Sequence, residues 1–400
     1  MPIGTILFFL QRRKNIMKKI LAIVLAVLMV AGCTVAFASC GGNDDTIKIG
    51  VSGPLTGGAA LYGTAVKNAA ELAIKEINDK GGLKNGVKLE LISYDDKADG
   101  NNVATGYASM LEAGMQLSLG CVTSGAALEF KKLSKEDNVF FLTPSATADK
   151  VPEFDNGYQM CFADSNQGGE AAKYVNSLNL DKIGILYRSD DAYSTGIYNQ
   201  FKANLKEGIT TVDAAFTGEA PTDMSAQITL LKDCKFIFCP IYYTPASTFM
   251  TQAKDIIATD AVYYGCDGFD GIESAEGFDI SVIPQKVSML SHFDSKATTG
   301  VAGDFVTNYT AAYGKETLNQ FGASAYDCIY ALAGALNAAI DAGKEVTADT
   351  TAEEMCKILQ EQFNGDYKFT GVTGTDVTWQ SNGYVTKTAK YIVIKEANAQ

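Results

Sequence analysis

The chain has 400 residues, 47% of them hydrophobic, and its 33 basic and 46 acidic residues give a formal net charge of −13 at pH 7. Five basic residues and no acidic ones precede Cys40, so the chain beyond it carries 28 basic against 46 acidic side chains. This negative charge argues against nucleic acid or an anionic membrane surface as a partner. The roughly 360 residues after Cys40 are more than one domain usually holds.

The first forty residues have the features of an export signal. Lys18-Lys19 precede an apolar run at 20–30, which has the length of a signal-peptide core and is too short for a membrane-spanning helix. Met17 stands directly before the basic pair, so residues 1–16 are a candidate extension upstream of the true start. The sequence therefore predicts a signal peptide over 1–40.

Two cysteines compete as the lipid-bearing residue of a bacterial lipoprotein. Val30-Ala31-Gly32-Cys33 fits the lipobox pattern, and Phe37-Ala38-Ser39-Cys40 fits it less closely. Cys40 is followed by polar residues over 41–46 that suit a flexible tether. We favour Cys40, with Cys33 as the alternative, and cleavage near Ala38 without lipidation as a third reading.

Strand-like and helix-like segments alternate over most of the remaining chain. A β-branched run at 47–51 leads through a small-residue loop at 56–63 to an amphipathic helix at 66–77, which ends at Gly81-Gly82. Further strands are expected at 87–93, 115–120, 139–142, 183–187, 235–239, 261–265 and 287–290, and helices at 102–113, 126–136, 168–178, 196–206, 225–232 and 245–257. Such alternation predicts βαβ units and mostly parallel sheets.

Two later stretches break this rhythm. Segments 302–313 and 323–342 are expected to form a pair of helices, the second deeply packed because it is almost entirely apolar or small. The segment 377–394 has Asn382-Gly383 at its turn, which is a hairpin signature.

Four short motifs in order resemble the branched-chain amino-acid binding proteins, the extracytoplasmic receptors of ABC importers. They are the opening stretch 47–82, Tyr94-Asp95-Asp96, the run 143–147, and Gly265-Cys266-Asp267-Gly268. The resemblance implies an α/β type I periplasmic-binding-protein fold with two lobes. Each lobe is a mostly parallel sheet flanked by helices, and the ligand binds in the cleft between them.

The resemblance also implies three chain crossings between the lobes. On this sequence they fall near 161–164, 291–294 and 370–373. We therefore expect lobe 1 to comprise 47–162 and 293–370, and lobe 2 to comprise 163–292 and 371–400.

The loops after the expected strands carry the candidate ligand residues. Ser124 can cap the helix that follows it, and the free N–H groups there favour an anion, although a simple N-cap is the plainer interpretation. The resemblance assigns ligand contacts to Tyr62, Val122, Thr123, Ser124, Ser145, Ala146, Thr147, Tyr193, Tyr242 and Asp267. In this assignment Ser145 and Thr147 meet the ligand's amino and carboxylate ends. The alternative for the run 143–147 is an ordinary turn that contains proline.

The side pocket and the lid follow from the same resemblance. Leu61, Tyr62, Val122 and Thr123 would line the side pocket, with Phe293 as a further wall. Tyr193 and Tyr242 would close over the ligand from lobe 2, with Tyr243 as the rival of Tyr242, although tyrosines also serve as plain packing at such surfaces.

Asp267 is the residue to which we give most weight. The resemblance implies a charge-assisted bond from its carboxylate to the ligand's α-ammonium group. The alternative is that Asp267-Gly268 simply forms a turn.

Cysteine usage departs from the family and excludes several kinds of site. Family members often carry a disulfide near Asp96 and Ser124, but Lys97-Ala98 and Thr123 stand at these positions, so this bond should be absent. The seven cysteines after Cys40 form no CxxC pair, so we expect no metal site. Most sit in apolar runs and are interpreted as small buried hydrophobic residues, and the sequence leaves their redox state open.

No motif of an enzyme stands out. The chain has a single histidine, His292, which we interpret as structural, and it lacks a Gly-x-Ser-x-Gly elbow, a P-loop and a metal-ligand cluster. We therefore expect no catalytic activity, no cofactor and no metal.

The predicted function is that of a monomeric, lipid-anchored substrate-binding protein on the outer face of the cytoplasmic membrane. It would bind a free amino acid, branched-chain or another small neutral one, by hinge closure and deliver it to the permease subunits of an ABC importer. The alternative is a ligand-sensing receptor domain, or a binding protein for amides, urea or aromatic acids. The sequence stops at Gln400 after the hairpin, without an apolar span, which favours the carrier over the sensor.

Overall fold

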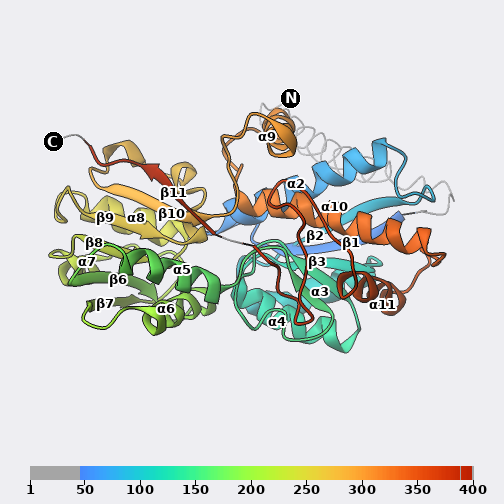
Figure 1. Ribbon diagram of the computed structural model, residues 1–400, viewed down its shortest axis with the longest axis horizontal. Helices are drawn as coiled ribbons and strands as arrows, with labels where there is room; N and C mark the ends of the chain where they lie inside the picture. Colours follow the sequence, from blue (N-terminus) through green and yellow to red (C-terminus); the bar gives the residue numbers. More distant parts are fainter. Residues whose placement is uncertain (1–45, 388, 399–400) are drawn as a thin grey trace, which may run out of the picture. The chain divides into compact units, whose positions relative to one another are not determined.

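A computed structural model describes residues 46–387 and 389–398 (Figure 1). The predicted signal, both candidate lipidation cysteines and nearly all of the tether lie outside the described residues. None of the helices in the described ranges combines the length and the apolar character that a membrane crossing requires.

The first sheet has five strands in the order β2-β1-β3-β4-β5, and every neighbouring pair is parallel. The strands are β1 (Thr46–Gly53), β2 (Lys88–Asp95), β3 (Leu117–Cys121), β4 (Phe140–Thr143) and β5 (Gly157–Gln159). Ile47 and Ile49 of the interior strand β1 are completely buried, as are Leu117 and Leu119 of the central strand β3. A sheet covered on both faces buries such continuous apolar strands.

Helices from both halves of the chain cover this sheet. They are α2 (Ala60–Asp79), α3 (Gly100–Glu112), α4 (Ser124–Glu136), α9 (Gly300–Tyr313), α10 (Gln320–Asp341) and α11 (Ala352–Phe363). The long helix α10 lies against α2 in Figure 1, where the two are coloured orange and blue. A Cβ atom at Gly322 would lie 3.1 Å from the Ala65 carbonyl oxygen, so the small residues of α10 allow this close approach. We refer to this sheet and its helices as lobe 1.

The second sheet has six strands in the order β11-β10-β9-β8-β6-β7, parallel except for the antiparallel pair β10–β11. The strands are β6 (Lys182–Arg188), β7 (Thr210–Phe216), β8 (Phe236–Cys239), β9 (Val262–Gly265), β10 (Lys286–Ser291) and β11 (Lys390–Lys395). They alternate with α5 (Asp164–Asn176), α6 (Ala192–Asn204), α7 (Ser225–Leu231), α8 (Tyr243–Ala253) and the 3-10 helices η1 (Asp267–Phe269), η2 (Ile272–Ser274) and η3 (Ile280–Val282). We refer to this sheet and its helices as lobe 2. The predicted two-lobed α/β fold is therefore confirmed.

The C-terminal segment contacts both lobes. The indole N–H of Trp379 donates to the Gln159 carbonyl oxygen at 2.8 Å, and the Gln159 N–H donates to the Gly383 carbonyl oxygen at 3.0 Å. The expected turn at Gly383 is present, with an isolated bridge between Trp379 and Val385. Only β11 then joins the second sheet. These contacts place 377–385 against lobe 1, whereas we expected all of 371–400 in lobe 2, because a hairpin signature does not reveal which sheet the hairpin meets.

Candidate functional site

Loops from both sheets meet around one small cavity. Its lining residues follow β1, β3 and β4 of lobe 1 and β6, β8 and β9 of lobe 2, together with the first turn of α10. They are Tyr62, Val122, Thr123, Ser124, Ser145, Tyr193, Tyr242, Asp267 and Phe321. Ligands of open α/β sheets bind at such carboxyl ends of strands. The free space between these side chains is about 10 Å³, roughly what a single water molecule needs, so the lining side chains nearly fill the cavity.

The lobe 1 wall of this cavity is the N-terminus of α4. Thr123 is its N-cap residue, yet no side chain caps the helix, and the buried Thr123 hydroxyl has no hydrogen-bond partner among the described residues. The expectation that Ser124 caps this helix is wrong. The helix begins two residues earlier than predicted, and the Ser124 hydroxyl instead accepts from the Ala148 N–H at 3.2 Å. An uncapped helix N-terminus with a spare hydroxyl suits a carboxylate.

The lobe 2 wall carries a buried carboxylate with one unused oxygen. Asp267 is 1% exposed, and its Oδ1 atom accepts from the Tyr193 hydroxyl at 2.7 Å. Its backbone N–H donates to Gln167 at 3.0 Å, whereas Oδ2 has no partner within the described part of the chain. Burial raises the pKa of Asp267 to about 7, despite the opposing hydrogen bond from Tyr193. A cation at Oδ2 would satisfy this carboxylate.

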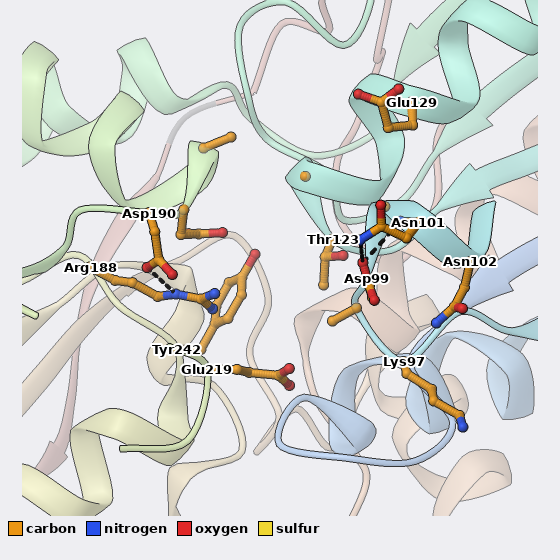
Figure 2. Close-up of a pocket in the computed structure, with 15 residues that line it drawn as sticks. Lys97, Asp99, Asn101, Asn102, Thr123, Glu129, Arg188, Asp190, Glu219 and Tyr242 are labelled. Carbon is orange, nitrogen blue, oxygen red and sulfur yellow. Dashed lines mark hydrogen bonds and ion pairs between the residues drawn. The ribbon is translucent and has the colours of Figure 1, made fainter. Parts of the chain in front are cut away.

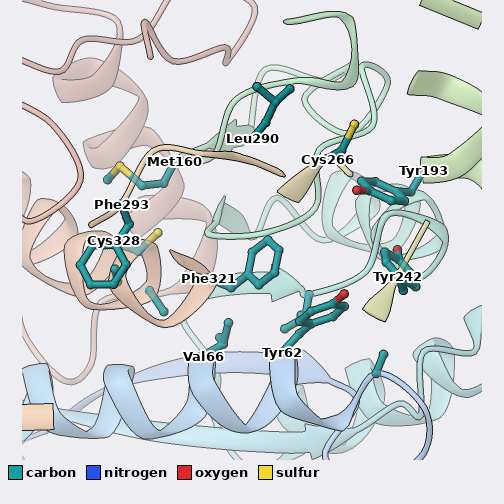
Figure 3. Packing of buried hydrophobic residues seen from close by; sticks show 14 of the residues in the cluster. Tyr62, Val66, Met160, Tyr193, Tyr242, Cys266, Leu290, Phe293, Phe321 and Cys328 are labelled. Carbon is teal, nitrogen blue, oxygen red and sulfur yellow. The ribbon is translucent and has the colours of Figure 1, made fainter. Parts of the chain in front are cut away.

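Aromatic rings form the rest of the cavity wall (Figure 3). Tyr193 and Tyr242 stack with ring centroids 4.8 Å apart, and Tyr62 meets Phe321 edge to face at 4.8 Å. The Tyr62 hydroxyl donates to the Gly268 carbonyl oxygen at 2.5 Å, so its ring rather than its hydroxyl is free to contact a ligand. Together with Val122, these rings make one end of the cavity apolar.

A family model described as periplasmic binding protein matches residues 46–390. The chain belongs to this family. It is 34% identical over 247 residues to the Leu/Ile/Val-binding protein BraC3 of Rhizobium johnstonii, an alignment that covers 60% of this chain and 66% of the relative. It is 30% identical to the leucine-, isoleucine-, valine-, threonine- and alanine-binding protein of Pseudomonas aeruginosa, covering 62% of this chain and 68% of that protein. The chain thus spans about two thirds of the length of these relatives.

A solved structure agrees with this assignment. The substrate-binding protein LivJ of Streptococcus pneumoniae, in complex with isoleucine, superposes with a TM-score of 0.75 at 27% identity, covering 88% of this chain and 99% of LivJ. The resemblance to the branched-chain amino-acid binding proteins that the sequence motifs indicated is therefore confirmed.

The cavity of this periplasmic binding protein brings together eight of the ten predicted ligand residues. The two others are buried but do not line it. The Ala146 carbonyl oxygen accepts from Gln159 at 2.8 Å, and the Thr147 carbonyl oxygen accepts from the Asp164 N–H at 2.8 Å.

Phe321 is a cavity residue that the sequence reading missed. It takes the place that we expected for Phe293, which instead packs on Phe305 outside this cavity. Asn319 caps α10 by accepting from the Phe321 and Gly322 N–H groups. This capping asparagine could have located the helix start, but no local signal shows that Phe321 meets the ligand loops.

A wider, charged groove of about 670 Å³ opens next to the cavity (Figure 2). Thr123 and Tyr242 line both spaces, so the groove is the mouth of the cavity. Its lobe 1 rim includes Lys97, and its lobe 2 rim includes Arg188, whose Nε atom donates to Asp190 at 2.8 Å.

Lys97 and Ala98 have positive φ angles of 56° and 57°, which non-glycine residues rarely adopt. Asp95 and Asp96 accept from their two N–H groups, at 3.1 and 2.9 Å, and so hold this rim in place. Cys121, the last residue of β3, is a buried cysteine with a free thiol among the described residues.

His292 lies outside the cavity. It is buried, its Nε2 atom is 2.7 Å from the Ser324 hydroxyl, and its ring packs edge-on against Phe162. Burial holds its pKa well below the usual value, so the imidazole is neutral. Within the described residues, no three His, Cys, Asp or Glu side chains gather in a way that could hold a metal ion.

Proposed function

We propose that this periplasmic binding protein binds a free α-amino acid with an aliphatic side chain and presents it to the permease of an ABC importer. One observation carries the proposal: Asp267 Oδ2 and Thr123 Oγ1, which have no hydrogen-bond partner among the described residues, belong to opposite walls of one small cavity. The first suits a cation and the second, at a helix N-terminus, suits an anion. The ligands named for the relatives share an α-ammonium and an α-carboxylate group.

Each part of the ligand has a place in this proposal. The ammonium group pairs with Asp267, and the carboxylate lies at the start of α4 beside Thr123, with Ser145 close by. The side chain lies against the apolar end formed by Tyr62, Val122 and Phe321. Because this end offers rings and methyl groups, a branched aliphatic side chain gains most from burial there.

The lobes close on the ligand about the chain crossings, with 47–162 and 293–370 in lobe 1 and with 163–292 and β11 in lobe 2, while 377–385 contacts lobe 1. The leader 1–40 directs export, and Cys40, or alternatively Cys33, anchors the chain as a monomeric, non-enzymatic receptor on the extracytoplasmic face. Ala146 and Thr147 support the ligand loops without lining the cavity.

A ligand screen followed by one variant tests the proposal. In a thermal-shift screen, leucine, isoleucine and valine should stabilise the protein most, and amides, urea and aromatic acids should not. Asp267→Ala should then abolish leucine binding in calorimetry, while Glu276→Ala, which removes an exposed carboxylate from the same segment, should not. Stabilisation only by ligands without an α-ammonium group would refute the amino-acid proposal and favour an amide, urea or aromatic-acid receptor.

A further inference from the structure

The two lobes also contact one another directly, beside the ligand cavity. The Tyr62 hydroxyl on α2 donates to the Gly268 carbonyl oxygen at 2.5 Å and accepts from the Tyr243 N–H at 3.2 Å. Tyr243 is the first residue of α8, so its N–H is one of those that a helix leaves without an internal partner. A lobe 1 side chain thus supplies a hydrogen-bond acceptor for a free N–H group at the N-terminus of a lobe 2 helix.

The opposite arrangement occurs a few residues away. Asp270, at the end of η1 in lobe 2, accepts from the Gln320 N–H at 2.8 Å. Gln320 is the first residue of α10, and Asn319 of lobe 1 already accepts from the next two N–H groups. Asp270 therefore accepts from the one N–H group of this first turn that Asn319 does not bond. A carboxylate at this position also interacts favourably with the positive end of the helix dipole.

The backbone between these two contacts is shaped to allow them. A Cβ atom at Gly268 would lie 2.7 Å from both the Ile241 carbonyl oxygen and the Tyr193 hydroxyl, so a larger residue would push the strand-end loop away. Two further bonds lie beside the pair: the Leu61 N–H donates to the Tyr243 hydroxyl at 3.2 Å, and the Thr244 hydroxyl donates to the Gly58 carbonyl oxygen at 2.5 Å.

We propose that Tyr62 and Asp270 form a reciprocal clasp, in which each lobe caps a helix of the other, and that this clasp sets how readily the lobes close. In the closed state, the backbone N–H groups of Tyr243 and Gln320 donate to Tyr62 and Asp270 of the opposite lobe. In the open state, they donate to water instead. Asp270 lies outside the cavity lining and acts as a positioning residue. The inference deepens the proposed function, because it rests on hinge closure as the mode of binding.

The test compares variants by small-angle X-ray scattering with and without leucine. Asp270→Ala and Tyr62→Phe each remove one arm of the clasp, and the latter keeps the aromatic ring. Asp279→Ala is the matched control, because Asp279 accepts from the Ser281 N–H within lobe 2 alone. Without leucine, both clasp variants should have a larger radius of gyration than the unchanged protein and the control. Saturating leucine should remove the difference.

Calorimetry provides the second measurement. A lost hydrogen bond to a charged group weakens association by about tenfold or more, so Asp270→Ala should raise the Kd for leucine by about that factor. Equal radii without leucine and an unchanged Kd would overturn the proposal. If Asp270→Ala does not fold, Tyr62→Phe and Asp270→Asn decide in its place. If no amino acid binds, the proposed function fails, while the scattering of the protein without leucine still decides the clasp.

Discussion

Asp267, the residue proposed to bind the ligand's ammonium group, should lower the free energy of unfolding of the ligand-free protein. Its carboxyl is buried, its pKa is about 7 in place of 3.8, and its Oδ2 atom has no partner among the described residues. A raised pKa stabilises the fold most below about pH 4, and this contribution is lost as the pH rises through 7. The ionised side chain therefore lowers the free energy of unfolding at pH 8, and Asp267→Asn should remove this loss.

The magnitude follows from the two pKa values. A change from 3.8 to about 7 corresponds to about 4 kcal/mol at pH 8. The amide keeps the acceptor for the Tyr193 hydroxyl but adds a buried N–H₂ group, at a cost of about 1–3 kcal/mol. We expect Asp267→Asn to be more stable than the unchanged protein by about 1–3 kcal/mol at pH 8. At pH 4, where the carboxyl is protonated and only the cost of the buried amide remains, the variant should be the less stable of the two.

Urea unfolding without ligand, followed at pH 4, 6 and 8, measures this effect. Glu276→Gln is the control, because it removes an exposed carboxylate from the same segment and should leave the pH profile unchanged. The reasoning is refuted if Asp267→Asn is no more stable than the unchanged protein at pH 8, or if both lose stability equally between pH 4 and pH 8.

Three further effects follow from the site and the hinge. The Kd for leucine should rise about tenfold from pH 8 to pH 6, because protonation of Asp267, with a pKa of about 7, competes with the ammonium group. Phe321→Ala should weaken leucine binding more than phenylalanine binding, because the lost ring leaves room beside Tyr62, and calorimetry with both ligands measures the ratio. Asp327→Ala should destabilise the fold by about 3 kcal/mol or more in urea unfolding, because the buried Val372 and Thr373 N–H groups, each 2.7 Å from its carboxylate, lose their acceptor.

Each of these effects has its own control. The pH effect should disappear in Asp267→Asn, and a Kd that stays constant between pH 6 and pH 8 contradicts it. Phe293→Ala removes a ring outside the cavity and should leave the ratio of the two affinities unchanged. Asp366→Ala removes an exposed carboxylate and should leave the unfolding midpoint unchanged, whereas an equally mild effect of Asp327→Ala would show that its bonds are dispensable.

The sequence predicted the elements with strong periodicity and missed those without it. The buried strands β1, β3, β4, β6, β8, β9 and β10 were expected because their residues are largely apolar, whereas the buried three-residue strand β5 was missed. Strand β7 was missed because it lies at the edge of the second sheet and lacks a continuous apolar run. Four of its seven residues, two threonines, an aspartate and an alanine, are at least partly exposed to solvent. Helix α11 was also missed, although Thr351 and Glu354 form a capping box that could have indicated its start.

The site was predictable to the extent that each residue follows a strand. Thr123, Tyr193 and Asp267 follow strand ends by two, five and two residues. The rule for carboxyl ends and the family resemblance therefore placed them together in the expected cleft. Phe321 and Asp270 reach their positions only through the packing of α10 against lobe 2, which no local pattern encodes. Contacts between distant segments therefore account for most of what the sequence left open.

The seven buried cysteines make the protein a convenient scaffold for an optical sensor. All seven in the described part of the chain are free, and burial raises the pKa of each thiol, so few are present as the reactive thiolate. A single cysteine introduced on the rim, for example at Lys97, would react with a fluorophore far faster than they do. A dye attached there would report the proposed hinge closure without prior removal of these seven thiols.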